Sequence, residues 1–224
     1  MASKRVPKQK GTLTLDVTVL VVDSNYESVT LAAFEYREKH VYPYLKSKGL
    51  SLKKLQGPMA RRHYVAPEAS KPQVGYLTGV GHGLANEYTG DHSDSIFQVG
   101  NYHPDEVKGK IAHFLSCQTA RELGPDFVRN GCLAYFGYDE NFTFIMVDRE
   151  LFFECDSEID KAFADGLPAA QVYTRVKSLF DERISELRAA NKEYLAATLE
   201  FDRDHLRCPS SGGENWGDET AKLS

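Results

Sequence analysis

Apolar residues occur in short runs that alternate with amphipathic stretches along the chain. The run at 12–23 is rich in β-branched residues, which is typical of a strand buried on both faces. Later runs predict strands at 73–81, 110–117 and 132–139, and the run at 96–100 fits a short strand or a loop tip. Helical signals fall between these runs, at 28–49, 103–109 and 119–131. Strands that alternate with helices form βαβ units, so we predict an α/β fold with three layers, α/β/α, around a mostly parallel central sheet.

The predicted helices carry start and stop signals. Within 28–49, Pro43 is expected to interrupt the last turns because proline has no N–H to donate. A proline takes the first helical position near the start of 103–109, and the helix at 119–131 ends on Gly131.

A longer amphipathic pattern runs through 169–205 and predicts one long C-terminal helix. An apolar stripe of that length needs a partner along its whole face. Packing across the sheet accounts for the first half. The second half either folds back onto its own domain, which is the favoured alternative, or docks on another subunit or a regulator.

The remaining organisation is one domain with a tail at each end. Residues 1–11 are polar and basic, and residues 209–224 are rich in Gly, Ser and charge, so both are predicted to be flexible tails. No internal repeat and no Pro/Gly-rich linker divides 12–208, which we predict to be a single domain.

Composition narrows the class of partner. The 224 residues are 42% hydrophobic and carry a net charge of −5, which points neither to nucleic acid nor to an anionic membrane. No run approaches the roughly 18 apolar residues of a membrane span, and the basic start has no apolar segment resembling a signal peptide. We therefore expect a cytoplasmic protein with no nucleic-acid and no membrane partner.

Two chemically capable residues follow buried strands. His82 stands between two glycines after 73–81, and Cys117 ends 110–117. Because the carboxyl ends of parallel strands meet at one edge of a sheet, we expect these side chains to lie together. An imidazole and a helix N-terminus near Thr119 would favour the thiolate, and the N–H of Gly83 could bind an oxyanion.

Other candidate ligands carry weaker signals. The four cysteines form no CxxC pair, so Cys132, Cys155 and Cys208 are expected to be plain thiols, with neither a zinc site nor a disulfide framework. His92 and His103 lie in polar loops, and His113 is expected in the core. The acidic loop at 91–95 could coordinate calcium but is more simply solvated. No metal site is supported, and the chemistry needs no cofactor.

Three motifs together resemble a known family. They are "GHG" after an apolar strand, "FLSCQTARELGPDFVRNGCLAYFG", and a later "FADGLPAAQVYTRVKSLF". Over about residues 75–185 the chain is similar to the caspase-like (clan CD) cysteine peptidases, and most closely to their CHAT branch. The resemblance implies a caspase-like fold and peptide-bond hydrolysis, with Cys117 as nucleophile, His82 as general acid/base and Gly83 as an oxyanion donor.

The resemblance also concerns the pocket that binds P1, the substrate residue directly before the scissile bond. In this family the loop after the first strand and the segment around the cysteine line that pocket. In this chain these two segments supply Asp23, Ser24, Asn25 and Ser116. Asp23 would then pair with a basic P1 side chain, or it caps a turn instead. No glycine follows Cys117, so the caspase preference for aspartate is not carried over.

These observations predict a cysteine endopeptidase that cleaves a protein or peptide substrate through a Cys117/His82 dyad. The resemblance suggests a regulated or defence-related role in a prokaryote, with a possible regulatory protein partner. The alternative is a catalytically silent caspase-like module that binds a protein partner through the C-terminal helix. It predicts an ordinary thiol pKa for Cys117 and a His82 that points elsewhere. An amidase-type thiol hydrolase fits less well, because those enzymes usually place the cysteine before the histidine.

Overall fold

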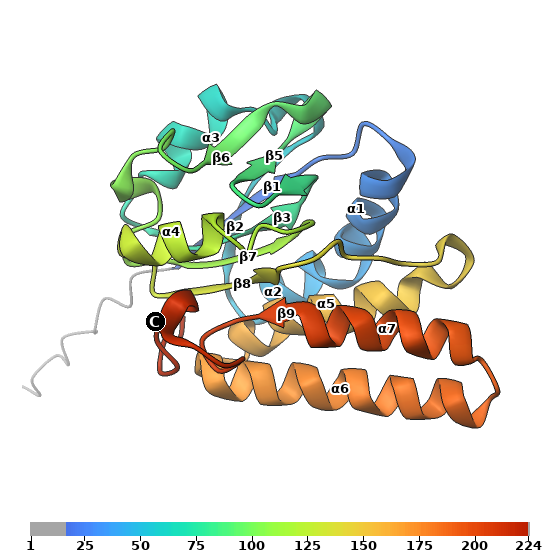
Figure 1. Cartoon of the computed structure of the whole chain (residues 1–224). Coiled ribbons are helices and arrows are strands. Elements are labelled where there is room, and N and C mark those ends of the chain that lie inside the picture. Colours follow the sequence, from blue (N-terminus) through green and yellow to red (C-terminus); the bar gives the residue numbers. More distant parts are fainter. Residues whose placement is uncertain (1–16, 224) are drawn as a thin grey trace, which may run out of the picture.

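A six-stranded sheet forms the centre of the protein (Figure 1). The computed structural model describes residues 17–223, so the first residues of the strand predicted at 12–23 and the whole of 1–11 lie outside the described part. The strands, in spatial order, are β2 (Ser51–Gln56), β1 (Thr18–Asp23), β3 (Val74–Val80), β7 (Ile111–Leu115), β8 (Ala134–Tyr138) and β9 (Leu206–Arg207). The first five are parallel and β9 is antiparallel to β8. The prediction of an α/β fold with a mostly parallel sheet is confirmed.

Helices cover both faces of this sheet. Val19 and Val21 of β1 belong to one apolar core, and Leu20 and Val22 belong to another on the opposite face. The first core takes in α1 (Ser28–His40), α2 (Tyr42–Ser47) and α5 (Arg149–Ala164), and the second takes in α3 (Arg62–Ala69) and α4 (Leu123–Arg129). Two-sided burial explains why the predicted strands are continuous apolar runs.

Several elements differ from the sequence prediction in detail. The helix predicted at 28–49 is divided into α1 and α2, and Pro43 lies in the first turn of α2, where its missing N–H costs nothing. The segment 103–109 forms only a 3₁₀ turn at Pro104–Glu106. A small second sheet, not predicted as such, follows β3 and consists of β4 (Gly83–Leu84), β5 (Glu87–Thr89) and β6 (Ser95–Gln98).

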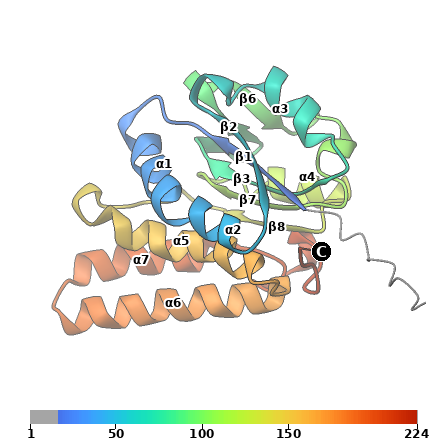
Figure 2. The same ribbon diagram turned by 180° about the vertical axis from the view of Figure 1, so that it is seen from behind.

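The single long C-terminal helix predicted over 169–205 is wrong. The structure has two helices, α6 (Ala169–Ala189) and α7 (Glu193–His205), which lie side by side in Figures 1 and 2. The chain reverses at Asn191, whose φ of 58° is left-handed, a conformation that asparagine tolerates better than most residues. The second half of the pattern therefore folds back onto its own domain, as the favoured alternative predicted. None of the helices within residues 17–223 combines the length and apolar character needed to cross a bilayer.

The segment 209–223 is packed on the domain, which corrects the prediction of a flexible tail over 209–224. Trp216 donates its indole N–H to the carbonyl of Ala120 at 2.9 Å, and Gly217 forms a bridge with Ala134 of β8. Ala221 is 8% exposed and accepts a hydrogen bond from the backbone of Ala169. Partial burial of an indole and backbone hydrogen bonds hold a segment whose composition alone indicates disorder.

Candidate active site

His82 and Cys117 line one small cavity at the carboxyl edge of the sheet. His82 follows β3, Cys117 follows β7, and Gly81 donates its N–H to the carbonyl of Leu115 between the two strand ends. Walls from α1, α5 and the loop after β8 complete the cavity. The hydrogen bonds found within residues 17–223 include none between the imidazole and Sγ of Cys117.

Gly83 makes close contact with the turn that carries the cysteine. A Cβ built on Gly83 would lie 2.3 Å from the carbonyl oxygen of Cys117 and 2.7 Å from Thr119, so no larger residue fits. Gly83 lies opposite Tyr88 in the β4–β5 pair. The adjacent residues, His82 and Thr89, are joined by the hydrogen bond from the N–H of Thr89 to the carbonyl of His82. Because hydrogen-bonded pairs alternate along an antiparallel ladder, the N–H of Gly83 points away from β5. This N–H is therefore not used by the β4–β5 ladder.

A carboxylate that the sequence did not single out binds His82. Nε2 of His82 lies 3.1 Å from Oε1 of Glu27, and the same oxygen accepts the N–H of Thr30 at the start of α1. A carboxylate accepts and does not donate, so Nε2 carries the proton and Nδ1 of the neutral ring keeps its lone pair. Glutamate is not among the preferred helix caps, and Glu27 gives no signal of this role in the sequence.

The surroundings of Cys117 favour the neutral thiol. Burial raises its pKa, the N–H of Phe142 offsets this in part, and the carboxyl of Asp202 adds to the rise. The expected help from a helix N-terminus near Thr119 is absent, because α4 begins only at Leu123 and a turn precedes it. The prediction of a thiolate favoured at rest by that helix is therefore wrong.

Hydrogen bonds to the loop after β8 hold the turn at Cys117. Gln118 has a left-handed φ of 59°, donates its backbone N–H to the carbonyl of Glu140 at 3.0 Å, and donates its side-chain amide to Asn141 at 2.9 Å. Ser116 lines the cavity beside Cys117, and its hydroxyl lies 3.1 Å from that of Thr119. Ser116 thus shapes the turn, and its hydroxyl is already engaged.

The other residues predicted to bind substrate do not reach the cavity. Asp23 is fully buried and accepts hydrogen bonds from Tyr42 at 2.5 Å and from the backbone of Val80 at 3.1 Å. Burial raises its pKa against the opposing charge of Arg37. Ser24 is also fully buried, and Asn25 lies against Gly57. The expectation that Asp23 receives a basic side chain is therefore corrected, because this carboxyl ties β1 to β3 inside the protein.

A buried ionic network lies under the same sheet. Arg37 donates to Asp160 at 2.9 Å and to Thr78 at 2.7 Å, and all three side chains are buried. His113 is buried as predicted, and burial alone would lower its pKa, but Asp156 and Asp160 at 3.2 and 3.3 Å raise it to about 9. His113 is thus a charged core residue that links β7 to α5.

His92, His103 and the acidic loop at 91–95 have structural partners. His92 is largely exposed and stacks on Tyr26 with ring centroids 4.8 Å apart, and His103 caps the 3₁₀ turn that follows it. In the acidic loop, Asp91 pairs with Arg61 at 2.7 Å. Within residues 17–223 no group of three or more His, Cys, Asp or Glu side chains is placed to hold a metal ion. The cysteines other than Cys117, namely Cys132, Cys155 and Cys208, are buried free thiols.

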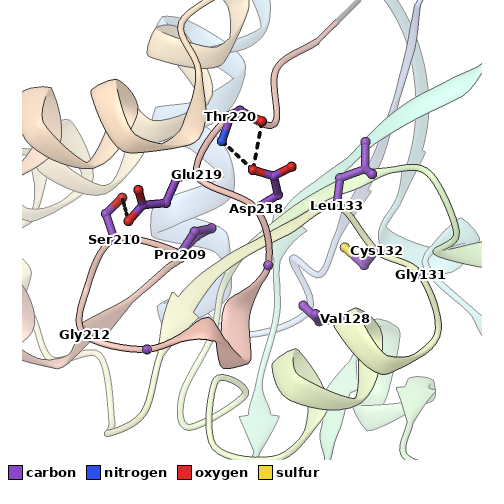
Figure 3. A pocket seen from close by; sticks show the side chains of 12 residues that line it. Val128, Gly131, Cys132, Leu133, Pro209, Ser210, Gly212, Asp218, Glu219 and Thr220 are labelled. Atoms are coloured by element: carbon purple, nitrogen blue, oxygen red, sulfur yellow. Dashed lines mark hydrogen bonds between the residues drawn. The ribbon is translucent and has the colours of Figure 1, made fainter.

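A larger hollow of about 970 Å³ opens at the opposite, amino edge of the sheet (Figure 3). Its polar side chains bind one another: Ser210 donates to Glu219 at 3.2 Å, and Thr220 donates to Asp218 at 2.8 Å. Burial raises the pKa of Cys132 at this site to about 12, so its thiol is inert. The smaller cavity at His82 and Cys117 carries the reactive groups.

No protein-family model matches the chain, and no curated protein proves similar to it. An α/β fold by itself hosts many unrelated chemistries. The function is therefore inferred from the side chains at the carboxyl edge of the sheet.

Proposed function

We propose that this protein is a cysteine endopeptidase in which Cys117 attacks the substrate and His82 transfers the proton. One observation carries the proposal: a thiol and an imidazole line one cavity at the carboxyl ends of β3 and β7, and the next residue, Gly83, has a backbone N–H that points away from β5. This edge is where open parallel sheets bind their ligands. The resemblance of the sequence motifs to caspase-like peptidases agrees with this reaction.

The first half of the reaction forms a thioester. Nδ1 of His82 takes the proton from the thiol of Cys117 as Sγ bonds to the substrate carbonyl carbon, and the carbonyl π electrons move to oxygen. The N–H of Gly83 stabilises that oxyanion. When the carbonyl re-forms, the C–N bond breaks and the imidazolium gives its proton to the departing amine. Glu27 stabilises the imidazolium in the interval.

The second half restores the thiol. Water attacks the thioester carbon while His82 accepts a water proton. The C–S bond then breaks, and the imidazolium returns the proton to Sγ as the carboxylic acid leaves. Because burial raises the pKa of Cys117, the thiol stays protonated at rest, and His82 acts as a general base during the attack.

Alkylation with iodoacetamide tests the dyad. The purified protein is labelled from about pH 5 to about pH 9, and each labelled cysteine is quantified by peptide mass spectrometry. We expect Cys117 to react at neutral pH faster than the three buried cysteines, and we expect its own rate to fall in His82→Ala. His92→Ala is the matched control, because it removes a neighbouring exposed imidazole that does not line the cavity. Equal labelling of Cys117 in wild type and His82→Ala would contradict the proposal.

The second candidate is the silent module, and one observation favours it: Cys117 has a raised pKa and no hydrogen bond to His82. In that case the exposed side chains of α7, Tyr194 at 73% and Phe201 at 42%, would serve partner binding. The alkylation experiment separates the two functions, since a silent module predicts no effect of His82→Ala on Cys117.

A further inference from the structure

The cavity beside Cys117 is lined almost entirely by hydrocarbon. Apart from the dyad, most of its walls are aliphatic or aromatic side chains: Val29, Ala33, Val80, Leu115, Phe142, Phe144 and Phe153. Thr30 adds a hydroxyl that is directed to the carbonyl of Glu27 at 3.3 Å. His82 is the sole ionisable group besides the thiol among the lining residues.

The size of the cavity limits what can enter. Its volume is about 40 Å³, and a single water needs roughly 10 to 15 Å³ on the same measure. It therefore holds about three atoms of carbon size, which is the size of a small branched aliphatic side chain. A lysine or arginine chain is too long, and an aspartate would lose its hydration without gaining a countercharge.

Resting on the proposed function, we propose that this cavity receives the P1 side chain and selects valine or leucine there. Cys117 itself lines the cavity, so a P1 side chain inside it would bring the carbonyl of that same residue to Sγ of Cys117. Asp23, the one acidic residue expected to select a basic substrate, is fully buried and bonded to Tyr42 and Val80. Val29 is 42% exposed and stands at the mouth of the cavity.

Peptidyl acyloxymethyl ketones with identical P4–P2 residues test the selection. The second-order rate of Cys117 labelling is measured for P1 Ala, Val, Leu, Phe, Lys and Asp. We expect Val or Leu to react roughly 10- to 100-fold faster than Ala, because missing methylenes in an apolar pocket cost this much. Lys and Asp are expected to be slower than Val or Leu by about 100-fold or more.

A pair of variants on one helix tests the location. Ala33→Val adds two carbons to the cavity wall, whereas Ala32→Val adds the same two carbons at a neighbouring buried position that does not line the cavity. We expect Ala33→Val to shift the preference from Leu toward Ala by about tenfold. Ala32→Val should leave the order of the P1 series unchanged. Thermal unfolding of both variants confirms that they fold, and the wild-type series tests the selection independently of either variant.

The outcomes separate this inference from the function on which it rests. If iodoacetamide labelling of Cys117 depends on His82 but a Lys or Asp ketone reacts fastest, the apolar P1 pocket is refuted and the dyad stands. An unchanged P1 order in Ala33→Val refutes the location in the same way. If no ketone labels Cys117 and its alkylation is independent of His82, the proposed function fails and the P1 inference falls with it.

Discussion

Replacing Asp202 with asparagine is predicted to change how the stability of the protein depends on pH. Asp202 lies on α7 and is 1% exposed; its Oδ1 accepts the N–H of Thr143 at 2.9 Å, and its Oδ2 has no hydrogen-bond partner among the described residues. Burial raises the pKa of this carboxyl to about 8, the Thr143 N–H opposes the rise, and Asp156 adds to it. The folded protein therefore keeps Asp202 protonated at neutral pH.

The sign and size of the effect follow from proton linkage. The unfolded chain titrates Asp202 at its ordinary pKa of 3.8, so between about pH 4 and about pH 8 the folded state holds a proton that the unfolded state has released. The free energy of unfolding consequently falls as pH rises through this window and levels off above it. At about 1.4 kcal/mol per pH unit, the loss reaches about 4 kcal/mol at pH 7. Asp202→Asn removes this loss.

The amide introduces a cost of its own. Its NH₂ group places another unpaired donor in the same buried position, which costs about 1–3 kcal/mol at every pH. The variant is thus expected to be less stable than wild type near pH 4 and more stable by about 1–3 kcal/mol near pH 7. Groups that titrate in both proteins cancel from the difference.

Urea unfolding followed by circular dichroism, from about pH 4 to about pH 9, measures this difference. Asp204→Asn is the matched control, since Asp204 lies on the same helix with a 58% exposed side chain and is expected to change stability by no more than about 0.5 kcal/mol. A difference between Asp202→Asn and wild type that stays constant with pH would refute the buried, protonated carboxyl.

The same variant has a second readout at the thiol. Ionised Asp202 raises the pKa of Cys117, so its charge opposes the thiolate only above about pH 8. Alkylation of Cys117 in Asp202→Asn should equal that of wild type near neutral pH and exceed it near pH 9. Equal rates at both values would show that the two groups do not interact.

Three further predictions concern the site and the fold. Glu27→Gln keeps an acceptor for the helix cap but removes the charge beside His82. The His82-dependent labelling of Cys117 should fall by about fivefold or less, because a partly exposed ion pair is worth up to about 1 kcal/mol. An unchanged rate would mean that the carboxylate plays no part. Gly83→Ala forces a Cβ against the carbonyl of Cys117 and should lower the free energy of unfolding by about 1–3 kcal/mol, measured in urea, with a further loss of labelling by peptidyl ketones. Asn191→Val should lower the melting temperature, because a β-branched residue at a φ of 58° costs about 1–2 kcal/mol, whereas Asn191→Gly should not lower it. Equal melting temperatures for the two variants would argue against a left-handed turn there.

The strands that could be predicted are those buried on both faces. β1, β3, β7 and β8 are short apolar runs because helices or loops cover both sides of the sheet there. β2 is an edge strand that contains two consecutive lysines, Lys53 and Lys54; charged residues protect an edge but hide the strand from a search for apolar runs. The reversal at Asn191 has no proline or glycine to mark it, so the pattern of α6 and α7 reads as continuous.

One part of the site could be predicted from the sequence, because the carboxyl ends of parallel strands meet at one edge of a sheet. That rule brings His82 and Cys117 to one edge from the order of the strands alone. Glu27 depends on where α1 begins, and the aromatic walls depend on the path of the loop after β8, neither of which has a local signal. Asp23 was assigned wrongly because its partner Arg37 comes from the next helix, and the ion pair exists only once that helix packs on the sheet.

The loop after β8 connects the C-terminal hairpin to the turn at Cys117. Thr143 is held by Asp202 of α7, and the preceding residue, Phe142, both lines the cavity and directs its N–H to Cys117. Gln118 binds the same loop from the other side through Asn141. α7 therefore contacts the loop that supplies both a wall of the cavity and a hydrogen bond to the sulfur. A change that displaces α7 should alter P1 selection and thiol reactivity at once, whereas a change confined to Ala33 should alter selection alone.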